Sequence, residues 1–323
     1  MKCCVTGATG FVGQSLVLNL LQNGYEVIAP VRQADMPIIE FCYRHFPDHF
    51  RIRKINDLCS VYSWSTILES CDVVIHSAAR VHQINECSER VIQEYRAINT
   101  ELSALIAKMA FNAGVSHMIY LSSIKVYGQD QLSASSIQTP ITEQMIPEPD
   151  SPYGISKWEA EQELNSLVQR SWQSLTILRP PLVYGKGVKA NFAKLVKLVQ
   201  KGYPLPFAQV DNARSLLFVE NLSDAVIKCL KTPKCASDTF MLSDAVSYSL
   251  PVLINQISQS LGQGSSPLFP FPVIGLKFLG LLLGRSAQLE SLLGNLVIDC
   301  KKICSELEWV APYNLEQGLK DII

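Results

Sequence analysis

Short runs rich in apolar residues alternate with amphipathic stretches through the first half of the chain. The apolar runs predict strands, which we place at residues 2–5, 26–31, 51–55, 73–76, 117–122 and 175–178. Apolar residues at helical spacing predict helices, which we place at residues 10–23, 61–69, 96–113 and 153–169. Apolar strands that alternate with helices are typical of a parallel sheet covered on both faces. The pattern therefore predicts an α/β, doubly wound fold of the Rossmann type.

The alternation weakens in the second half, and this change predicts a second domain. Pro and Gly become frequent after the last predicted strand. We expect the first domain to comprise residues 1–178 together with about 212–234, because a strand and a helix in that second piece are expected to return to it. A smaller C-terminal domain then comprises residues 179–211 and 235–323.

Two further segments stand apart from the alternating pattern. Residues 129–152 are rich in Ser, Gln and Pro, and we expect a long loop there that borders a functional site. Residues 268–283 are strongly apolar but are interrupted by Lys277, so their apolar runs are too short to cross a bilayer. We expect a helix that packs in the core or against the smaller domain, and no stable membrane insertion. A contact along a membrane surface is the alternative.

Composition and charge narrow the class of partner. The 323 residues are 48% hydrophobic and 18% charged, which is typical of a well-buried globular enzyme. The 28 basic and 29 acidic residues nearly cancel, so no overall field favours nucleic acid. Any anionic substrate must therefore be bound by individual residues.

The ten cysteines are scattered and form no Cys-x-x-Cys pair. We expect mostly buried free thiols in a reducing, cytoplasmic compartment. Cys42, His45 and His49 lie close together, but no second ligand cluster follows, so a surface helix is the better interpretation and we expect no metal site.

Three glycines follow the first predicted strand directly. Gly7, Gly10 and Gly13 are spaced three apart between residues 2–5 and an amphipathic helix. Glycine permits a tight turn and close backbone approach, and a helix N-terminus presents free N–H groups and a positive dipole to a diphosphate. The sequence therefore predicts a dinucleotide site at this turn.

The end of the second strand bears on which dinucleotide binds there. An acidic residue at this place favours NAD, and an Arg favours the 2′-phosphate of NADP. Arg32 stands there, and the nearest acid, Asp35, comes several residues later. We therefore expect NADP(H), with NAD(H) as the alternative. Weaker signals for cofactor contacts follow the third and fourth strands, at Asp57, Leu58, Ala78 and Ala79.

Tyr153 and Lys157 are separated by one helical turn, and Ser123 follows the strand at 117–122. A free Tyr has a pKa of about 10, and an ammonium group about 4 Å away supplies roughly 4 kcal/mol at an effective dielectric of about 20. We therefore expect Lys157 to lower the pKa of Tyr153 and to hold a cofactor ribose. Tyr153 is the predicted acid–base group, and Ser123 is expected to bind the same substrate oxygen.

Together these motifs resemble the extended short-chain dehydrogenases/reductases of the nucleotide-sugar epimerase/dehydratase family. Residues 122–128 and 178–185 are most similar to bacterial 4-ketoreductases and 4-epimerases for UDP-N-acetylhexosamines. The resemblance implies further cofactor contacts at Phe11, Val12, Asn99 and Pro180. It also implies a homodimer formed through the helices at 96–113 and 153–169.

For the substrate, the resemblance implies a UDP-sugar. Asn191 and Arg214 are then expected at the diphosphate, and Pro206 and Phe207 near the base. A guanidinium fork also suits a diphosphate on first principles. A second phosphate-binding Arg that is usual in the family has no clear match, and Arg285 is the nearest candidate.

Differences from the family pattern indicate which of the candidate reactions is expected. Dehydratases carry an Asp-Glu pair where this chain has Ile124 and Lys125, so dehydration is not expected. The best-known 4-epimerases carry an Asn where Leu182 stands, and an acid at the tip of the second strand. We therefore expect reduction of a UDP-4-keto-6-deoxy-N-acetylhexosamine at C4 in O-antigen synthesis. The alternative is a UDP-glucose or UDP-N-acetylglucosamine 4-epimerase with retained NAD. A catalytically idle NADP-binding protein would typically lack Tyr153 or Lys157.

Overall fold

The structure is a computed structural model that describes residues 1–56, 58, 61–81, 89–232, 237–282, 284 and 286–322. Its strands are β1 (Lys2–Thr6), β2 (Glu26–Val31), β3 (Phe50–Lys54), β4 (Val73–His76), β5 (His117–Leu121), β6 (Ser174–Arg179), β7 (Leu182–Tyr184), β8 (Leu216–Phe218) and β9 (Asp238–Met241). Its larger helices are α1 (Phe11–Gln22), α2 (Pro37–His45), α3 (Val61–Leu68), α4 (Glu89–Arg96), α5 (Leu102–Asn112), α7 (Pro152–Leu167), α8 (Ala190–Gln200), α9 (Val219–Lys231), α10 (Leu250–Ser260), α11 (Val273–Leu282) and α12 (Ser286–Leu293). The short ones are the π-helical turn η1 (Ala97–Glu101), the 3-10 turn η2 (Ile124–Val126), α6 (Gln129–Ala134), α13 (Lys301–Leu307) and α14 (Leu315–Lys320).

A seven-stranded sheet forms the centre of the molecule, in the order β3-β2-β1-β4-β5-β6-β9. All of its strand pairs are parallel. The order reverses between β1 and β4, so the carboxyl ends of these two strands border the crevice in which ligands of such sheets bind. The doubly wound α/β fold predicted from the sequence is confirmed.

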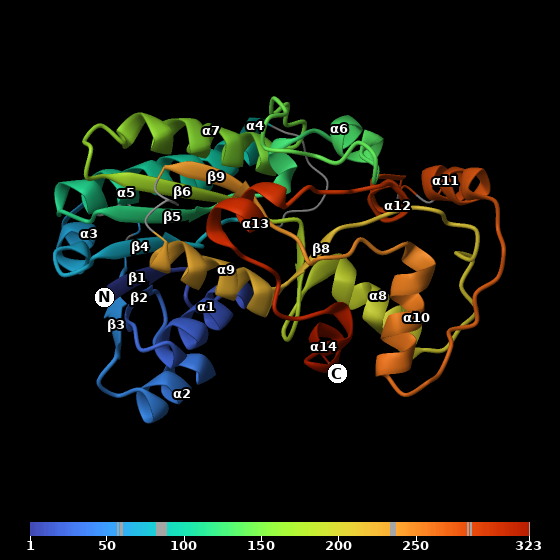
Figure 1. Ribbon diagram of the computed structural model, residues 1–323, viewed down its shortest axis with the longest axis horizontal. Coiled ribbons are helices and arrows are strands. Elements are labelled where there is room, and N and C mark those ends of the chain that lie inside the picture. The colour runs from blue at the N-terminus through green and yellow to red at the C-terminus, as the bar shows by residue number, and fades with distance from the viewer. Residues whose placement is uncertain are drawn as a thin grey trace.

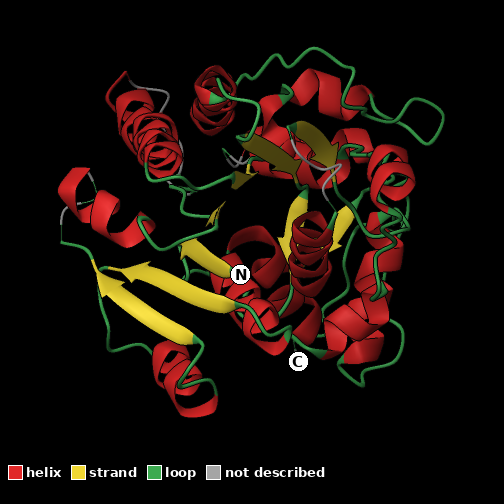
Figure 2. Ribbon diagram, turned by 60° about the vertical axis from the view of Figure 1, so that its left-hand side comes forward, coloured by secondary structure: helices red, strands yellow, loops and turns green. Residues whose placement is uncertain are grey.

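Helices cover both faces of this sheet (Figure 1). On one face α1, α9 and α13 bury residues such as Leu20, Val226 and Ile303. On the other face α3, α5 and α7 bury residues that include Ile106 and Leu164. Figure 2 shows the strands running between the surrounding helices. Burial on both sides explains why the middle residues of the central strands are mostly apolar.

A second, smaller core lies at the other end of the molecule, on the right of Figure 1. It is built around the parallel pair β7–β8 and the helices α8, α10, α11 and α14, with Phe192, Phe218 and Ile254 among its buried side chains. The boundary expected near residue 235 does not coincide with the sheet, because β9 pairs with β6. We therefore propose that β9 belongs to the first domain.

Two predicted segments differ from the structure. The helix expected at 96–113 starts earlier, with α4, and contains the π-helical turn η1. That wider turn buries Asn99 completely. The loop expected at 129–152 contains α6, whose first amide, that of Gln129, donates to the Asp150 carboxylate at 2.6 Å. This cap comes from a residue distant in sequence, so no local pattern reveals it.

The apolar segment 268–283 contains α11, which packs against the smaller core as expected but also has an exposed face. Leu276 and Gly280 of α11 are buried against the smaller core, but Ile274 is 83% exposed and Leu281 is 67% exposed. Among the described residues, no helix has the length and apolar character needed to cross a membrane. The expectation of mostly buried free thiols is confirmed for the described cysteines, of which Cys300 and Cys304 alone are not fully buried.

The two faces of α11 predict unequal effects of the same substitution. Leu276→Ala should lower the free energy of unfolding by about 2–4 kcal/mol, because it leaves a cavity in the smaller core. Leu281→Ala should change that energy by less than about 0.5 kcal/mol, because the side chain is exposed. Denaturant unfolding of both variants measures the difference, and equal losses would show that the outer face is covered.

Candidate active site

The glycine turn between β1 and α1 is shaped by close backbone contacts. Gly7 has a φ of +71°, and a Cβ added there would lie 2.8 Å from the Ala78 nitrogen. A Cβ on Gly13 would lie only 2.0 Å from the Gly7 carbonyl oxygen. No side chain fits at either position, so the turn requires both glycines.

The N-terminus of α1 is open toward this turn. Gly10 is the N-cap residue and provides no side-chain cap, and its own amide donates to the Gly7 carbonyl at 2.8 Å. Phe11, Val12 and Gly13 form the first turn of the helix. Their N–H groups and the helix dipole suit a diphosphate, so the turn fits the dinucleotide that the sequence predicts.

The part of the predicted cofactor site at the ends of β2 and β3 is defined by fewer contacts among the described residues. Arg32 follows β2 directly, as expected, and is exposed. Asp57 lies outside the described residues. The Leu58 carbonyl accepts a hydrogen bond from the Trp64 indole at 2.8 Å, and its side chain packs against the core beneath α3. A cofactor contact by Arg32 or Leu58 stays a prediction.

The chain after β4 is fixed beside the glycine turn. The Ala78 amide donates to the Thr6 hydroxyl at 3.2 Å, which brings Ala78 and Ala79 next to Gly7. Asn99 accepts from the Arg80 amide at 2.8 Å and donates to the Ser156 hydroxyl at 3.0 Å. Asn99 therefore connects this segment to α7, and the structure gives it a positioning role besides its predicted contact with cofactor.

Ser123, Tyr153 and Lys157 are brought together by β5 and α7. Ser123 begins the turn η2, and the next amide, that of Ile124, donates to the Pro180 carbonyl at 2.9 Å. Residue Gly154 allows α7 to lie against η2, because a Cβ there would lie 2.1 Å from the Lys125 carbonyl oxygen. The Ser123 hydroxyl hydrogen-bonds to the Tyr153 side chain.

Lys157 is almost completely buried, with 2% of its surface exposed. Its ammonium nitrogen donates to the Leu121 carbonyl at 2.7 Å and lies 4.5 Å from the centroid of the Tyr120 ring. Burial lowers the pKa of Lys157 to about 7, although the Glu161 carboxylate opposes that shift. The site therefore contains an amine that changes its charge near neutral pH.

Tyr153 differs from the sequence-based expectation. In the ligand-free protein, burial raises the pKa of Tyr153 to about 12, and the hydrogen bond from Ser123 only partly opposes the shift. The predicted lowering by Lys157 is wrong for this state, because the ammonium group is directed at Leu121 and the Tyr120 ring instead. A bound positive charge is needed to bring the pKa of Tyr153 down.

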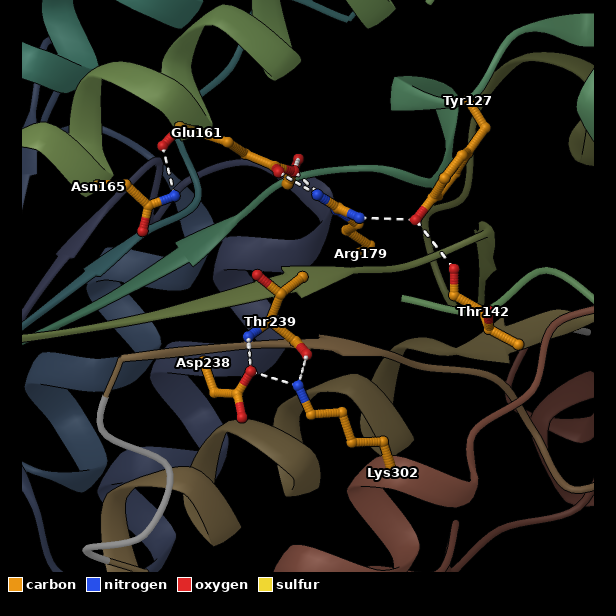
Figure 3. A network of polar contacts seen from close by, with 9 residues as sticks. Tyr127, Thr142, Glu161, Asn165, Arg179, Asp238, Thr239 and Lys302 are labelled. Atoms are coloured by element: carbon orange, nitrogen blue, oxygen red, sulfur yellow. Dashed lines mark hydrogen bonds and ion pairs between the residues drawn. The ribbon is translucent and has the colours of Figure 1, made fainter. Parts of the chain in front are cut away.

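A buried ion pair behind the catalytic residues was not predicted. The Arg179 guanidinium donates to both Glu161 carboxylate oxygens and to the Tyr127 hydroxyl, as Figure 3 shows. The Ser122 hydroxyl also donates to Glu161. Because Glu161 lies one turn beyond Lys157 in α7, helical spacing gave a signal for it. Its partner at the end of β6 had no local signal.

Comparison with known proteins identifies the family. The sequence model of the NAD dependent epimerase/dehydratase family matches residues 3–240. The chain belongs to this family. It is 36% identical to UDP-glucose 4-epimerase from Vibrio cholerae, over 98% of this chain and 92% of that protein. It is also 24% identical, over 97% of this chain and 91% of the relative, to an Escherichia coli O157:H7 N-acetyl-alpha-D-glucosaminyl-diphospho-ditrans,octacis-undecaprenol 4-epimerase.

Solved structures of other family members share the fold. UDP-glucose 4-epimerase from Thermotoga maritima with UDP-glucose superposes with a TM-score of 0.76, at 22% identity, over 99% of this chain and 96% of that one. UDP-glucuronic acid 4-epimerase from Bacillus cereus with NAD gives a TM-score of 0.75, at 20% identity, over 100% of this chain and 97% of that one. These structures show the fold, and membership of the NAD dependent epimerase/dehydratase family makes the chain an enzyme.

The predicted substrate residues of this family member lie in the smaller core and at its edge. Asn191 is exposed near the N-terminus of α8. Phe207 is buried in the core, with 7% of its surface exposed, and Pro206 is partly buried. The Arg214 guanidinium donates to the Gly294 carbonyl at 2.8 Å. Arg285 lies outside the described residues. Substrate contacts by these side chains stay predictions.

The glycine turn predicts a steric test of cofactor binding. Gly13→Ala should abolish NAD binding, because its Cβ would collide with the Gly7 carbonyl and displace the helix N-terminus. Gln22→Ala, at the exposed far end of α1, is the control. We expect the control to bind NAD within about tenfold of the parent protein in a fluorescence titration. NAD binding by Gly13→Ala at parent affinity would contradict this account of the turn.

The buried amine predicts a pH-dependent stability. An unfolded Lys keeps its proton up to a pH of about 10.4, whereas Lys157 in the fold releases it as the pH rises through about 7. The unfolded state therefore binds more protons between these values, and folding gains stability as pH rises. Lys157→Met removes this contribution, so its advantage in melting temperature over the parent protein should shrink between pH 7 and pH 9. A difference that does not change with pH would contradict the burial of a titrating amine.

Proposed function

We propose that the enzyme interconverts UDP-hexoses that differ in configuration at C4, and that it keeps NAD bound throughout the cycle. The observation that carries this proposal is the 36% identity, over 98% of the chain, to UDP-glucose 4-epimerase from Vibrio cholerae. The cluster of Ser123, Tyr153 and Lys157 supports it, because epimerisation needs acid–base groups at the C4 oxygen. This places epimerisation ahead of the reduction that the sequence motifs favoured.

The side chains of this site supply the proton chemistry at C4. NAD, when bound, would supply a reversible hydride acceptor for C4. The Tyr153 phenolate removes the proton from the C4 hydroxyl and returns it when the sugar is restored with the opposite configuration. The Ser123 oxygen accepts from the Lys125 amide at 3.2 Å, which leaves its hydroxyl hydrogen available to the Tyr153 or substrate oxygen.

Burial of the Tyr153 phenol favours its protonated form. With a pKa of about 12, Tyr153 is protonated at neutral pH in the ligand-free protein. The positive charge of an oxidised nicotinamide would stabilise the phenolate. Glu161 favours the protonated form of Lys157, so the buried ion pair behind the site helps to keep a positive charge there.

The substrate is proposed to span both cores. Arg214 binds the diphosphate, because a guanidinium fork matches phosphate oxygens. Asn191 supports the diphosphate from the start of α8, and Pro206 and Phe207 border the base. We propose a homodimer through α5 and α7, and a cytoplasmic role in polysaccharide synthesis. The similarity to the Escherichia coli relative, whose name includes undecaprenol, is consistent with that role.

Reduction of a 4-keto sugar is the second candidate, and Arg32 is the observation that favours it. This residue follows β2 where a 2′-phosphate would bind, and it is exposed and free to rearrange. A reductase would consume NADPH in proportion to product. Arg32→Ala should then weaken NADPH binding by about tenfold or more and leave NADH binding unchanged.

The epimerase proposal predicts a large effect at one phenol. Tyr153→Phe should lower the rate of UDP-galactose to UDP-glucose conversion by about a hundredfold to ten-thousandfold, because the acid–base group is lost. Tyr25→Phe is the matched control, since it lies just before β2 at the opposite end of the sheet, and its rate should stay within about twofold of the parent rate. Conversion by Tyr153→Phe at the parent rate would overturn the assigned chemistry.

A further inference from the structure

Lys125, on the turn after the catalytic serine, and Arg214 are two cationic side chains without a close ion pair in the described part of the chain. Arg214 is partly buried, and its guanidinium donates to the Gly294 carbonyl, a neutral acceptor. Burial lowers the pKa of Arg214 to about 10. A guanidinium that loses hydration without gaining a counterion is suited to an anionic ligand.

Lys125 is held on the same turn as the catalytic Ser123. Its amide donates to the Ser123 oxygen, and its ammonium nitrogen donates to the Gln129 side-chain oxygen at 3.0 Å. Burial lowers the pKa of Lys125; the Asp150 carboxylate opposes this shift, and the Arg214 guanidinium adds to it. The Asp150 carboxylate thus attracts the Lys125 ammonium group, and the Arg214 guanidinium repels it. Asp150 accepts from the Gln129 amide instead of pairing with the ammonium group.

A series of contacts through α6 connects Lys125 to Arg214. The Gln129 side chain donates to the Ser133 hydroxyl at 2.9 Å. Ser133 lies next to Gly294, where an added Cβ would be 3.4 Å from its hydroxyl oxygen. Gly294 in turn provides the carbonyl that Arg214 binds. Lys125 and Arg214 thus lie on either side of the contact between α6 and the chain at Gly294.

We propose that Lys125 is a second ligand of the substrate diphosphate and binds it together with Arg214. The inference rests on the proposed function, which supplies a nucleoside diphosphate with one end at Ser123. A diphosphate diester carries two negative charges, and one guanidinium balances only one of them. An anion between Lys125 and Arg214 relieves their mutual repulsion and replaces the hydration that each has lost. Lys125 is then a specificity residue for the diphosphate.

Comparing the binding of UDP with that of uridine tests whether Lys125 contacts the diphosphate. In isothermal titration of the full-length protein, Lys125→Met should weaken UDP binding by about ten- to a hundredfold, the usual range for one charged hydrogen bond. Uridine binding and NAD binding should stay unchanged. Lys125→Arg keeps the charge and should lose less than about tenfold. Lys231→Met, at the exposed end of α9, is the matched control and should bind UDP like the parent protein.

Thermal unfolding distinguishes ligand binding from a structural role. Without ligand, Lys125→Met should melt at the parent temperature or above it, because it removes a poorly compensated charge. UDP should raise the melting temperature of this variant less than that of the parent protein. A lower melting temperature without ligand, together with an unchanged response to UDP, would assign Lys125 a purely structural role and overturn the inference.

The outcomes separate this inference from the proposed function. Equal UDP affinities of the parent protein and Lys125→Met would overturn the role of Lys125 and leave epimerisation standing. UDP binding that depends on Lys125, in a protein without epimerase activity, would support the inference and count against the proposed reaction. A parent protein that binds no UDP would overturn both.

Discussion

The charge of Lys157 is buried at the end of β5, and the rest of the catalytic arrangement depends on how the fold accommodates it. Leu121 supplies a carbonyl oxygen, Tyr120 supplies an aromatic face, and Glu161 supplies a nearby negative charge. Glu161 is itself held by Arg179, so a buried ion pair supports the amine from behind. Removing one member of such a pair leaves an uncompensated charge, which is why we regard the group as a single structural unit.

The same imbalance of charge extends toward the substrate side of the site. Lys125 and Arg214 are cations without carboxylate partners among the ion pairs of the described residues, and the N-terminus of α1 has no side-chain cap. Preorganised positive charge of this kind favours anionic ligands, and it suits a proposed cofactor and a proposed sugar nucleotide that each carry one diphosphate.

Local sequence predicted the parts of the fold that depend on neighbouring residues. The apolar strands and the turn at Gly7 and Gly13 follow from burial on both faces and from backbone contacts. Features that join distant residues were missed: Arg179 meets Glu161 across 18 positions, and Asp150 caps α6 across 21. The pKa of Tyr153 was mispredicted because burial raises it. The Lys157 ammonium group is directed at Leu121 and the Tyr120 ring, and only the tertiary structure reveals those contacts.

The central claim is a closed redox cycle at C4, and isotope retention tests it most directly. UDP-galactose carrying deuterium at C4 would be incubated with the purified enzyme in two samples. One sample has no added cofactor. The other contains a pool of unlabelled NADH and NADPH, which would take up any label that leaves the site. We predict that the UDP-glucose formed keeps the deuterium at C4 in both samples, because the hydride returns from a cofactor that never leaves the site. Loss of the label to the added pool, or the absence of UDP-glucose from both samples, would contradict the account.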